Sequence, residues 1–243
     1  MRKVLFSIES NRQVAAGTFR LELSAPGYEH SGEFVDVALP GFYLRRPISV
    51  ADFGPGRITL IYKVVGEGTK LLSTLPAGSP LELLTGLGRG FDPARCTSKA
   101  LLVGGGLGAA PLLPLCKELR AEGKEVTVVL GFNRAEEAVL TAEFRALGAS
   151  LTVATMDGSL GVRGLVTDAI AAVRPEFDFF YTCGPLVMMK AVCNALPGGG
   201  QASLEERMGC GAGFCYGCSC HTVVGPRRIC ADGPVFDREE IIW

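Results

Sequence analysis

The chain has 243 residues, 48% of them hydrophobic and 20% charged, and carries a net charge of -1 at pH 7. This composition is typical of a globular protein with more than one core and excludes disordered and coiled-coil chains. The near-neutral charge argues against a nucleic-acid partner, and no apolar run approaches the roughly 20 residues of a membrane span.

The first third of the chain has the pattern of short strands separated by turns. Residues 18–23 and 57–63 alternate apolar and polar side chains, as strands with one buried face do. We therefore expect an antiparallel barrel or sandwich between about residues 4 and 84. A short helix is expected over residues 70–75, ended by Pro76.

After Cys96 the pattern changes to alternating strands and helices. The buried-strand run 100–103 leads through a glycine-rich turn into a helix that ends near Gly123. Further strands are expected at 126–130, 151–154 and 177–181, and further helices at 142–147, 165–173 and 187–195. This order predicts a small doubly wound parallel sheet.

A Pro-Gly-Gly-Gly break at residues 197–200 precedes a segment with few large apolar residues. Such a segment cannot build a core unaided, and a metal centre would supply the missing constraint. The sequence therefore predicts a multidomain β + α/β protein. We place its domains at residues 1–95, 96–198 and 199–243.

Five of the nine cysteines lie in this last segment. The N-terminus reaches Glu9 too soon for a signal peptide, so we expect a cytoplasmic protein, where clustered cysteines bind metal more often than they form disulfides. Four residues separate Cys210 from Cys215, two separate Cys215 from Cys218, and eleven more precede Cys230. This is the plant-type ferredoxin spacing for a [2Fe-2S] cluster. Structural zinc is the alternative, although zinc sites usually pair two short Cys-x2-Cys knuckles.

Cys220 is a second candidate for the fourth ligand. It follows the third ligand so closely that the loop would have to fold back tightly for both thiolates to reach iron, so we prefer Cys230. Gly211, Gly213 and Gly217 suit a loop that wraps a cluster and turns its N–H groups toward sulfur.

Two glycine-containing turns follow predicted strands of the middle domain. The first opens a helix and could bring a dinucleotide pyrophosphate to backbone amides. The second could border the nicotinamide. Both could instead be tight strand-to-helix connections without a ligand. The first turn contains Gly104, Gly105, Gly106, Gly108 and Pro111, and the second is Cys183-Gly184-Pro185.

The loop after the second strand of this domain would contact the adenosine ribose. Arg134 could hold a 2′-phosphate, whereas Glu136 or Glu137 could accept a hydrogen bond from a 2′-hydroxyl. The sequence therefore leaves the choice between NAD and NADP open.

In the first domain, Arg46-Pro47-Ile48-Ser49 places a guanidinium and a hydroxyl on one strand. About twenty residues later, Gly68-Thr69 opens the short helix. An arginine fork and a helix N-terminus with a threonine hydroxyl can together bind a dinucleotide pyrophosphate. A surface arginine and an ordinary helix cap are the alternative.

In this order the motifs resemble the ferredoxin-reductase superfamily, and most of all the electron-transfer subunits of type 1B dihydroorotate dehydrogenase. The resemblance runs over nearly the whole chain and is most specific at residues 205–210 and the cysteine loop after them. It implies an antiparallel β-barrel FAD domain, a doubly wound NAD domain and a small C-terminal [2Fe-2S] domain. Electrons would pass between NAD(H), FAD and the cluster. The implied flavin contacts are Arg46, Pro47, Ile48, Ser49, Ile61, Tyr62, Lys63, Gly68 and Thr69, and the implied cluster ligands are Cys210, Cys215, Cys218 and Cys230.

The partner in that family is a separate FMN-containing catalytic subunit that oxidises dihydroorotate in pyrimidine biosynthesis, usually within a heterotetramer. No catalytic acid or base is expected on this chain, because the cofactors perform the chemistry. Close relatives are diaphorase-like subunits of ferredoxin:NADP+ transhydrogenases, and a zinc-stabilised dinucleotide-binding regulator is the alternative from another class. The chain departs from the family pattern in its short segment between Cys218 and Cys230 and in the extra Cys220.

Overall fold

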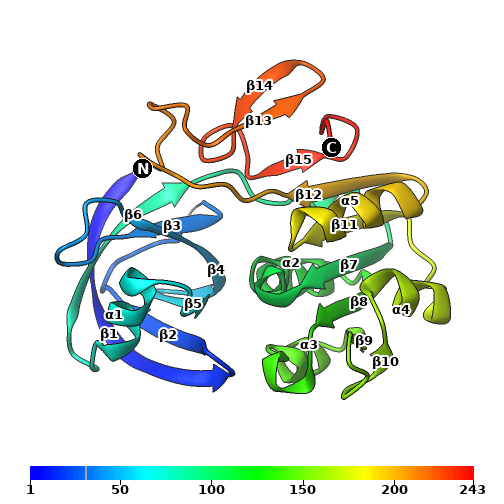
Figure 1. The fold of residues 1–243 in the computed structure, drawn as a ribbon, viewed down its shortest axis with the longest axis horizontal. Helices are drawn as coiled ribbons and strands as arrows, with labels where there is room; N and C mark the ends of the chain where they lie inside the picture. The colour runs from blue at the N-terminus through cyan, green and yellow to red at the C-terminus, as the bar shows by residue number, and fades with distance from the viewer. Residues whose placement is uncertain (31) are drawn as a thin grey trace. The chain divides into compact units, whose positions relative to one another are not determined.

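The structure is a computed structural model that describes residues 1–30 and 32–243. The chain divides into two compact units (Figure 1). The barrel unit contains Met1–Gly90, Glu205–His221 and Gly225–Pro234, and the sheet unit contains Phe91–Leu204, Thr222–Val224 and Val235–Trp243. Each unit is described by itself.

The barrel unit is built on a closed barrel of antiparallel strands, as the alternating segments predict. Inward-facing aliphatic and aromatic side chains from all of its strands form one core. In barrel order the strands are β1 (Arg2–Ala15), β2 (Thr18–Ser24), β5 (Arg57–Lys63), β4 (Arg46–Gly54), β3 (Phe34–Val37) and β6 (Pro80–Leu87).

One short helix, α1 (Glu67–Thr74), follows the barrel strand β5. It begins three residues earlier than the sequence pattern predicts, because the Thr69 hydroxyl accepts hydrogen bonds from the N–H groups of Val65 and Gly66 and so caps an earlier turn. Thr69 is therefore an N-terminal capping residue of α1, in addition to any contact with a ligand.

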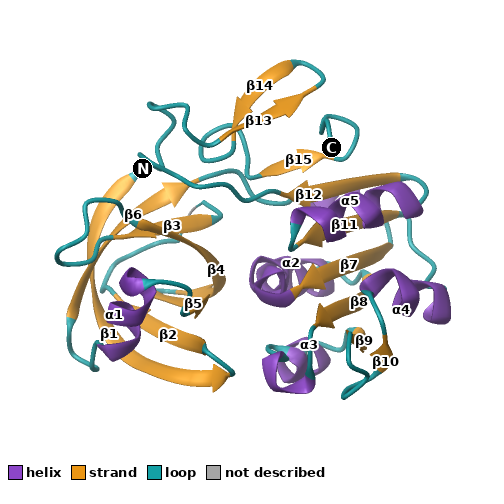
Figure 2. Cartoon of the chain, viewed as in Figure 1, coloured by secondary structure: helices purple, strands orange, loops and turns teal. Residues whose placement is uncertain are grey.

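The sheet unit is a mainly parallel sheet covered by helices on both faces, which confirms the predicted doubly wound arrangement. In Figure 1, α2 and α3 lie on one face of the sheet and α4 and α5 on the other; Figure 2 shows the same layers by element type. The sheet order is β10 (Val162–Arg163), β9 (Ser150–Thr155), β8 (Glu125–Phe132), β7 (Lys99–Gly105), β11 (Phe179–Cys183), β12 (Gly199–Ser203) and β15 (Val235–Asp237). The helices are α2 (Ala109–Ala121), α3 (Thr141–Ala146), α4 (Val166–Val173) and α5 (Leu186–Ala195), with short 3₁₀ turns η1 (Pro93–Arg95), η2 (Gly106–Gly108) and η3 (Ala135–Glu137).

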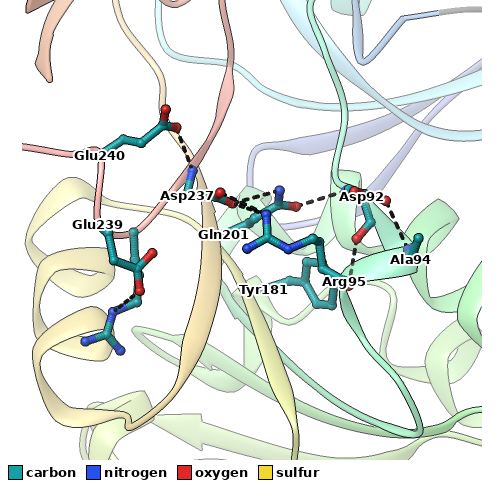
Figure 3. Close-up of polar contacts among 9 residues, drawn as sticks. Asp92, Ala94, Arg95, Tyr181, Gln201, Asp237, Glu239 and Glu240 are labelled. Carbon is teal, nitrogen blue, oxygen red and sulfur yellow. Dashed lines mark hydrogen bonds and ion pairs between the residues drawn. The ribbon is translucent and has the colours of Figure 1, made fainter. Parts of the chain in front are cut away.

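Two strands from the predicted third domain, β12 and β15, belong to this sheet. β12 extends it in parallel beside β11, and β15 closes the edge antiparallel to β12. A polar network holds that edge (Figure 3): Arg95 donates to both carboxylate oxygens of Asp237 at 3.0 and 2.8 Å, and Gln201 donates to Asp237 at 3.1 Å. The backbone of Asp92 donates to Gln201 and accepts from the Tyr181 hydroxyl, each at 2.9 Å. These contacts join the first residues of the sheet unit, around Asp92 and Arg95, to its edge strand β15.

The short segment between Cys218 and Cys230 is a hairpin of β13 (Ser219–Thr222) and β14 (Gly225–Arg228). Two residues connect the strands, so the segment is folded compactly despite its length. Within residues 1–30 and 32–243, no helix is long and apolar enough to cross a membrane.

Candidate cofactor sites

The four predicted cluster ligands lie in the barrel unit, on loops around Cys210–Cys218 and at Cys230. Backbone amides point at their sulfur atoms: Phe214 and Cys215 donate to Cys210 Sγ at 3.3 and 3.4 Å, and Cys230 donates to Cys218 Sγ at 3.4 Å. Such N–H···S contacts are the usual surroundings of an iron–sulfur cluster. The backbone N–H groups of the loop thus point toward sulfur, as the sequence analysis predicts.

The thiols interact mainly in two pairs. The side chain of Cys210 interacts with Cys215 and that of Cys230 with Cys218, while Cys230 interacts with Cys210 only through its charge. In the described part of the chain, no three His, Cys, Asp or Glu side chains converge as one bound ion requires. Two pairs suit a rhomb in which each iron takes two thiolates better than they suit one tetrahedral zinc ion.

The electrostatics of the first pair favour a metal-binding thiolate. Burial alone would raise the pKa of Cys210, but the backbone amides of Ala212 and Cys215 stabilise its anion and lower the pKa below the ordinary range for cysteine. Burial and the neighbouring Cys218 thiol raise the pKa of Cys230. Because metal ions displace thiol protons, a low pKa at one site eases loading of the first iron.

Arg228 forms a clamp between two parts of the cysteine segment. Arg228 donates to the Gly213 carbonyl at 2.8 Å and forms a two-pronged ion pair with Asp232, with Nε and Nη2 at 2.9 and 3.0 Å from its carboxylate. Its guanidinium also lies over the Tyr216 ring, 4.9 Å from the centroid, which is within the roughly 6 Å of a cation–π contact. The clamp joins the first part of the loop to the segment that carries Cys230.

On the barrel, the structure brings the two predicted dinucleotide-binding motifs together. The Arg46 guanidinium lies directly over Gly68, where a Cβ atom would come within 2.5 Å of Nε. Arg46 also donates to the Leu44 carbonyl and stacks over the Phe42 ring at 4.7 Å. A guanidinium held at the N-terminus of a helix is a site for an anionic pyrophosphate. The motifs therefore fit the group that the sequence predicts.

The remaining flavin candidates differ in what they can offer a ligand. Tyr62 is 2% exposed, its ring belongs to the barrel core, and its hydroxyl donates to Asn11 at 3.0 Å. Burial raises its pKa to about 12. The side chain of Tyr62 is therefore not open to a ligand. Ile48 and Ile61 are also buried, Ser49 and Lys63 are half-buried, and Pro47 is exposed.

In the sheet unit, the two predicted glycine turns lie side by side. β7 and β11 are parallel neighbours, and Cys183 is in register with Gly104. A Cβ atom on Gly108 would overlap the Cys183 carbonyl oxygen, so close packing of the two backbones is sufficient to require glycine at this position. Gly106, with φ of 55°, instead has open space around its Cα. Pro111 lies in the first turn of α2.

The topology explains why these turns suit a dinucleotide. From β7 the chain adds β8, β9 and β10 on one side, and then returns to place β11 on the other. Ligands of doubly wound sheets bind at the carboxyl ends of the strands at such a switch point. Pro185 caps α5 there, and Gly184 lies against the backbone of Gly105.

The predicted ribose loop follows β8. Asn133 donates to Glu137 at 2.9 Å, which fixes this carboxylate beside the strand end, and Ser159 accepts from the Ala135 amide at 2.8 Å. Arg134 and Glu136 are exposed. The loop presents both a fixed carboxylate and an exposed guanidinium.

A barrel with an arginine held at a helix N-terminus, a doubly wound sheet with glycine turns and a thiol loop are together typical of a flavoprotein reductase that also carries an iron–sulfur cluster. Residues 205–242 match the family described as the iron–sulfur cluster binding domain of dihydroorotate dehydrogenase B. The chain is 39% identical over 246 residues to the electron transfer subunit of dihydroorotate dehydrogenase B (NAD(+)) from Fusobacterium nucleatum, with 95% of each chain covered. The corresponding subunit of Geobacillus kaustophilus is 40% identical over 250 residues, with 97% of each covered.

Among solved structures, a chain of the NADH-dependent reduced ferredoxin-NADP oxidoreductase has a TM-score of 0.89 and 31% identity, covering 99% of this chain and 90% of that one. Phthalate dioxygenase reductase, at 20% identity and a TM-score of 0.65 over 79% of this chain, shares the fold. The chain belongs to the family of electron transfer subunits of dihydroorotate dehydrogenase B. It is an oxidoreductase subunit that transfers electrons between NAD, FAD and a [2Fe-2S] cluster.

Proposed function

We propose that this subunit exchanges electrons with an FMN-containing catalytic subunit that oxidises dihydroorotate, and so links that oxidation to NAD+ reduction. The relatives at 39% and 40% identity are named as electron transfer subunits of this enzyme, which implies a catalytic partner. The observation that carries the proposal is the cysteine loop, with two thiol pairs in the same compact unit as the dinucleotide-binding barrel motifs.

We assign the cofactors to the residues that the sequence predicts. Arg46, with the helix start at Gly68-Thr69, would hold the FAD pyrophosphate, and Pro47, Ile48, Ser49, Ile61, Lys63 and the Tyr62 backbone would line the flavin. Gly104–Gly108, Pro111 and Cys183–Pro185 would hold NAD(H). Cys210, Cys215, Cys218 and Cys230 would ligate the cluster. When bound, the flavin accepts a hydride from the nicotinamide and releases electrons one at a time to the cluster.

The residues around the cluster loop suit transfer to a partner. Phe214 and Tyr216 flank the exposed Cys215 and are 78% and 60% exposed. Exposed aromatic side chains are enriched where proteins bind each other. We propose that these two rings contact the catalytic subunit and exclude water from the path between the cluster and the FMN.

We also propose the assembly, the domain boundaries and the location of the chain. We infer a heterotetramer of two such subunits and two catalytic subunits, and three functional domains at residues 1–95, 96–198 and 199–243. We infer a cytoplasmic location, because a reducing compartment keeps clustered thiols available to bind iron in place of forming disulfides.

Co-purification tests the proposal. The chain would be expressed with a catalytic subunit of this family, purified without oxygen, and assayed for dihydroorotate-dependent NAD+ reduction, with the Cys230→Ser chain as a matched control. We expect a stable complex that reduces NAD+ only with the intact cluster loop. A chain that loads its cofactors but neither binds this subunit nor reduces NAD+ would contradict the proposal.

A second candidate function is supported by the likeness to the NADH-dependent reduced ferredoxin-NADP oxidoreductase. The same chain would then serve as a diaphorase-like subunit of a transhydrogenase. Affinity purification from the native cell distinguishes the two, because the partner that co-purifies would be a ferredoxin-linked subunit in place of a dihydroorotate-oxidising one.

A further inference from the structure

Asp36 is a buried carboxylate that none of the proposed cofactor contacts uses. It lies on β3 and is 2% exposed. Val35 and Val37 belong to the barrel core, so Asp36 and Phe34 are on the outer face of the strand. The segment that carries the cysteines covers that face: Phe34 and Pro234 both lie against Gly88, and Asp36 lies against Gly211.

The Asp36 carboxylate packs directly against the backbone of Gly211. A Cβ atom on Gly211 would overlap Asp36 Oδ2, and Gly211 has a φ of 64°, so both space and conformation require glycine there. Gly211 directly follows Cys210, so the carboxylate packs against the residue next to the first thiol. It therefore lies against the loop that wraps the proposed cluster.

Among the described residues, no ion pair neutralises the charge of Asp36. Its Oδ1 is buried and has no hydrogen-bond partner within residues 1–30 and 32–243. The nearest cations are Arg45 and Arg46, but Arg45 is paired with Glu82 at 2.6 Å, and Glu82 also accepts from Lys3 at 2.6 Å. Burial raises the pKa of Asp36 to about 6, against the two arginines, which lower it. At about pH 8 the carboxylate is therefore ionised.

We propose that Asp36 tunes the iron–sulfur centre: its buried carboxylate packs against the Cys210–Cys215 loop and lowers the reduction potential of the cluster. The inference rests on the proposed cluster at this loop. Reduction adds an electron to a centre that is already anionic, so a fixed negative charge nearby disfavours the reduced form. Asp36 is also in register with Pro47 on β4, so it lies between the loop and the strand of the proposed flavin motif.

The test compares Asp36→Asn and Asp36→Ser with the native chain by redox titration at about pH 8, monitored by the EPR signal of the reduced cluster. Asn keeps the size of the side chain, and Ser is smaller and cannot clash with the loop. We expect both variants to keep iron and acid-labile sulfide and to shift the cluster potential in the positive direction. Asp52→Asn is the matched control, because it removes a carboxylate about 16 Å further along β4 from Pro47, and it should leave the potential unchanged.

An unchanged potential in fully loaded Asp36→Asn would overturn the inference, since a residue that only packs would not move it. Iron loss from both variants with FAD content intact would also overturn it, because a neutral side chain that fits should leave the loop closed. A native chain without iron and sulfide would instead contradict the proposed function, so the two failures are distinguishable.

Discussion

Glu33→Gln should remove much of the pH dependence of stability of the barrel unit. Glu33 precedes β3, and its Oε1 is buried without a hydrogen-bond partner in the described part of the chain. Its Oε2 lies so close to Gly90 that a Cβ atom there would be 2.6 Å away. Burial raises the pKa of Glu33 from 4.5 to about 8.

The sign of the effect follows from proton linkage. The folded state holds the Glu33 proton more tightly than the unfolded state does, so this stabilisation is complete below about pH 4.5 and is lost as the pH rises through about 8. A shift of about 3.5 pH units corresponds to about 5 kcal/mol at about 1.36 kcal/mol per unit. Glu33 keeps some solvent exposure, which weakens the penalty, so we expect a loss of about 3 kcal/mol.

The assay is urea unfolding of the native and Glu33→Gln chains between about pH 5 and 9. The difference in free energy of unfolding, native minus variant, should fall by about 3 kcal/mol across this range. Glu29→Gln, which changes an exposed carboxylate of the same unit, should give a constant difference. A constant difference for Glu33→Gln as well would refute the reasoning.

Three further changes test separate parts of the account. Cys230→Ser should lose iron whereas Cys220→Ser should keep it, by iron and sulfide analysis, and loss from Cys220→Ser alone would reverse the ligand assignment. A Phe214→Ser variant should weaken binding of the catalytic subunit roughly 10-fold in a titration while the chain keeps its cofactors, and unchanged affinity would exclude this ring from the interface. Gly108→Ala should lower the free energy of unfolding by about 1 to 3 kcal/mol and slow flavin reduction by NADH, because its Cβ would overlap the Cys183 carbonyl oxygen, and native stability would contradict that packing.

Local patterns were enough to predict most of the architecture. The barrel strands alternate in character, so residues 57–63 were predicted with the bounds of β5. The central parallel strands are mostly apolar, as is typical of sheets buried on both faces. Cysteine spacing and glycine turns likewise depend on neighbours in sequence, and they predicted the thiol loop and the two turns that the structure places beside each other.

The features that the sequence did not reveal depend on contacts between distant residues. β15 has only three residues and pairs with β12, which lies more than thirty residues earlier. No local pattern marks such a strand, and its anchor, the Arg95–Asp237 ion pair, joins positions 142 residues apart. The burial of Asp36 was equally hidden, since an aspartate within an apolar run gives no sign of which loop will cover it.

Anaerobic titration of the purified chain with NADH tests the central claim most directly. Iron, sulfide and flavin would be quantified first, and the visible and EPR spectra followed during the titration. The account predicts about two irons per FAD, bleaching of the flavin absorbance, and a rhombic EPR signal from a reduced [2Fe-2S] cluster. A chain that binds zinc in place of iron, or one whose flavin is reduced while the cluster stays oxidised, would contradict it.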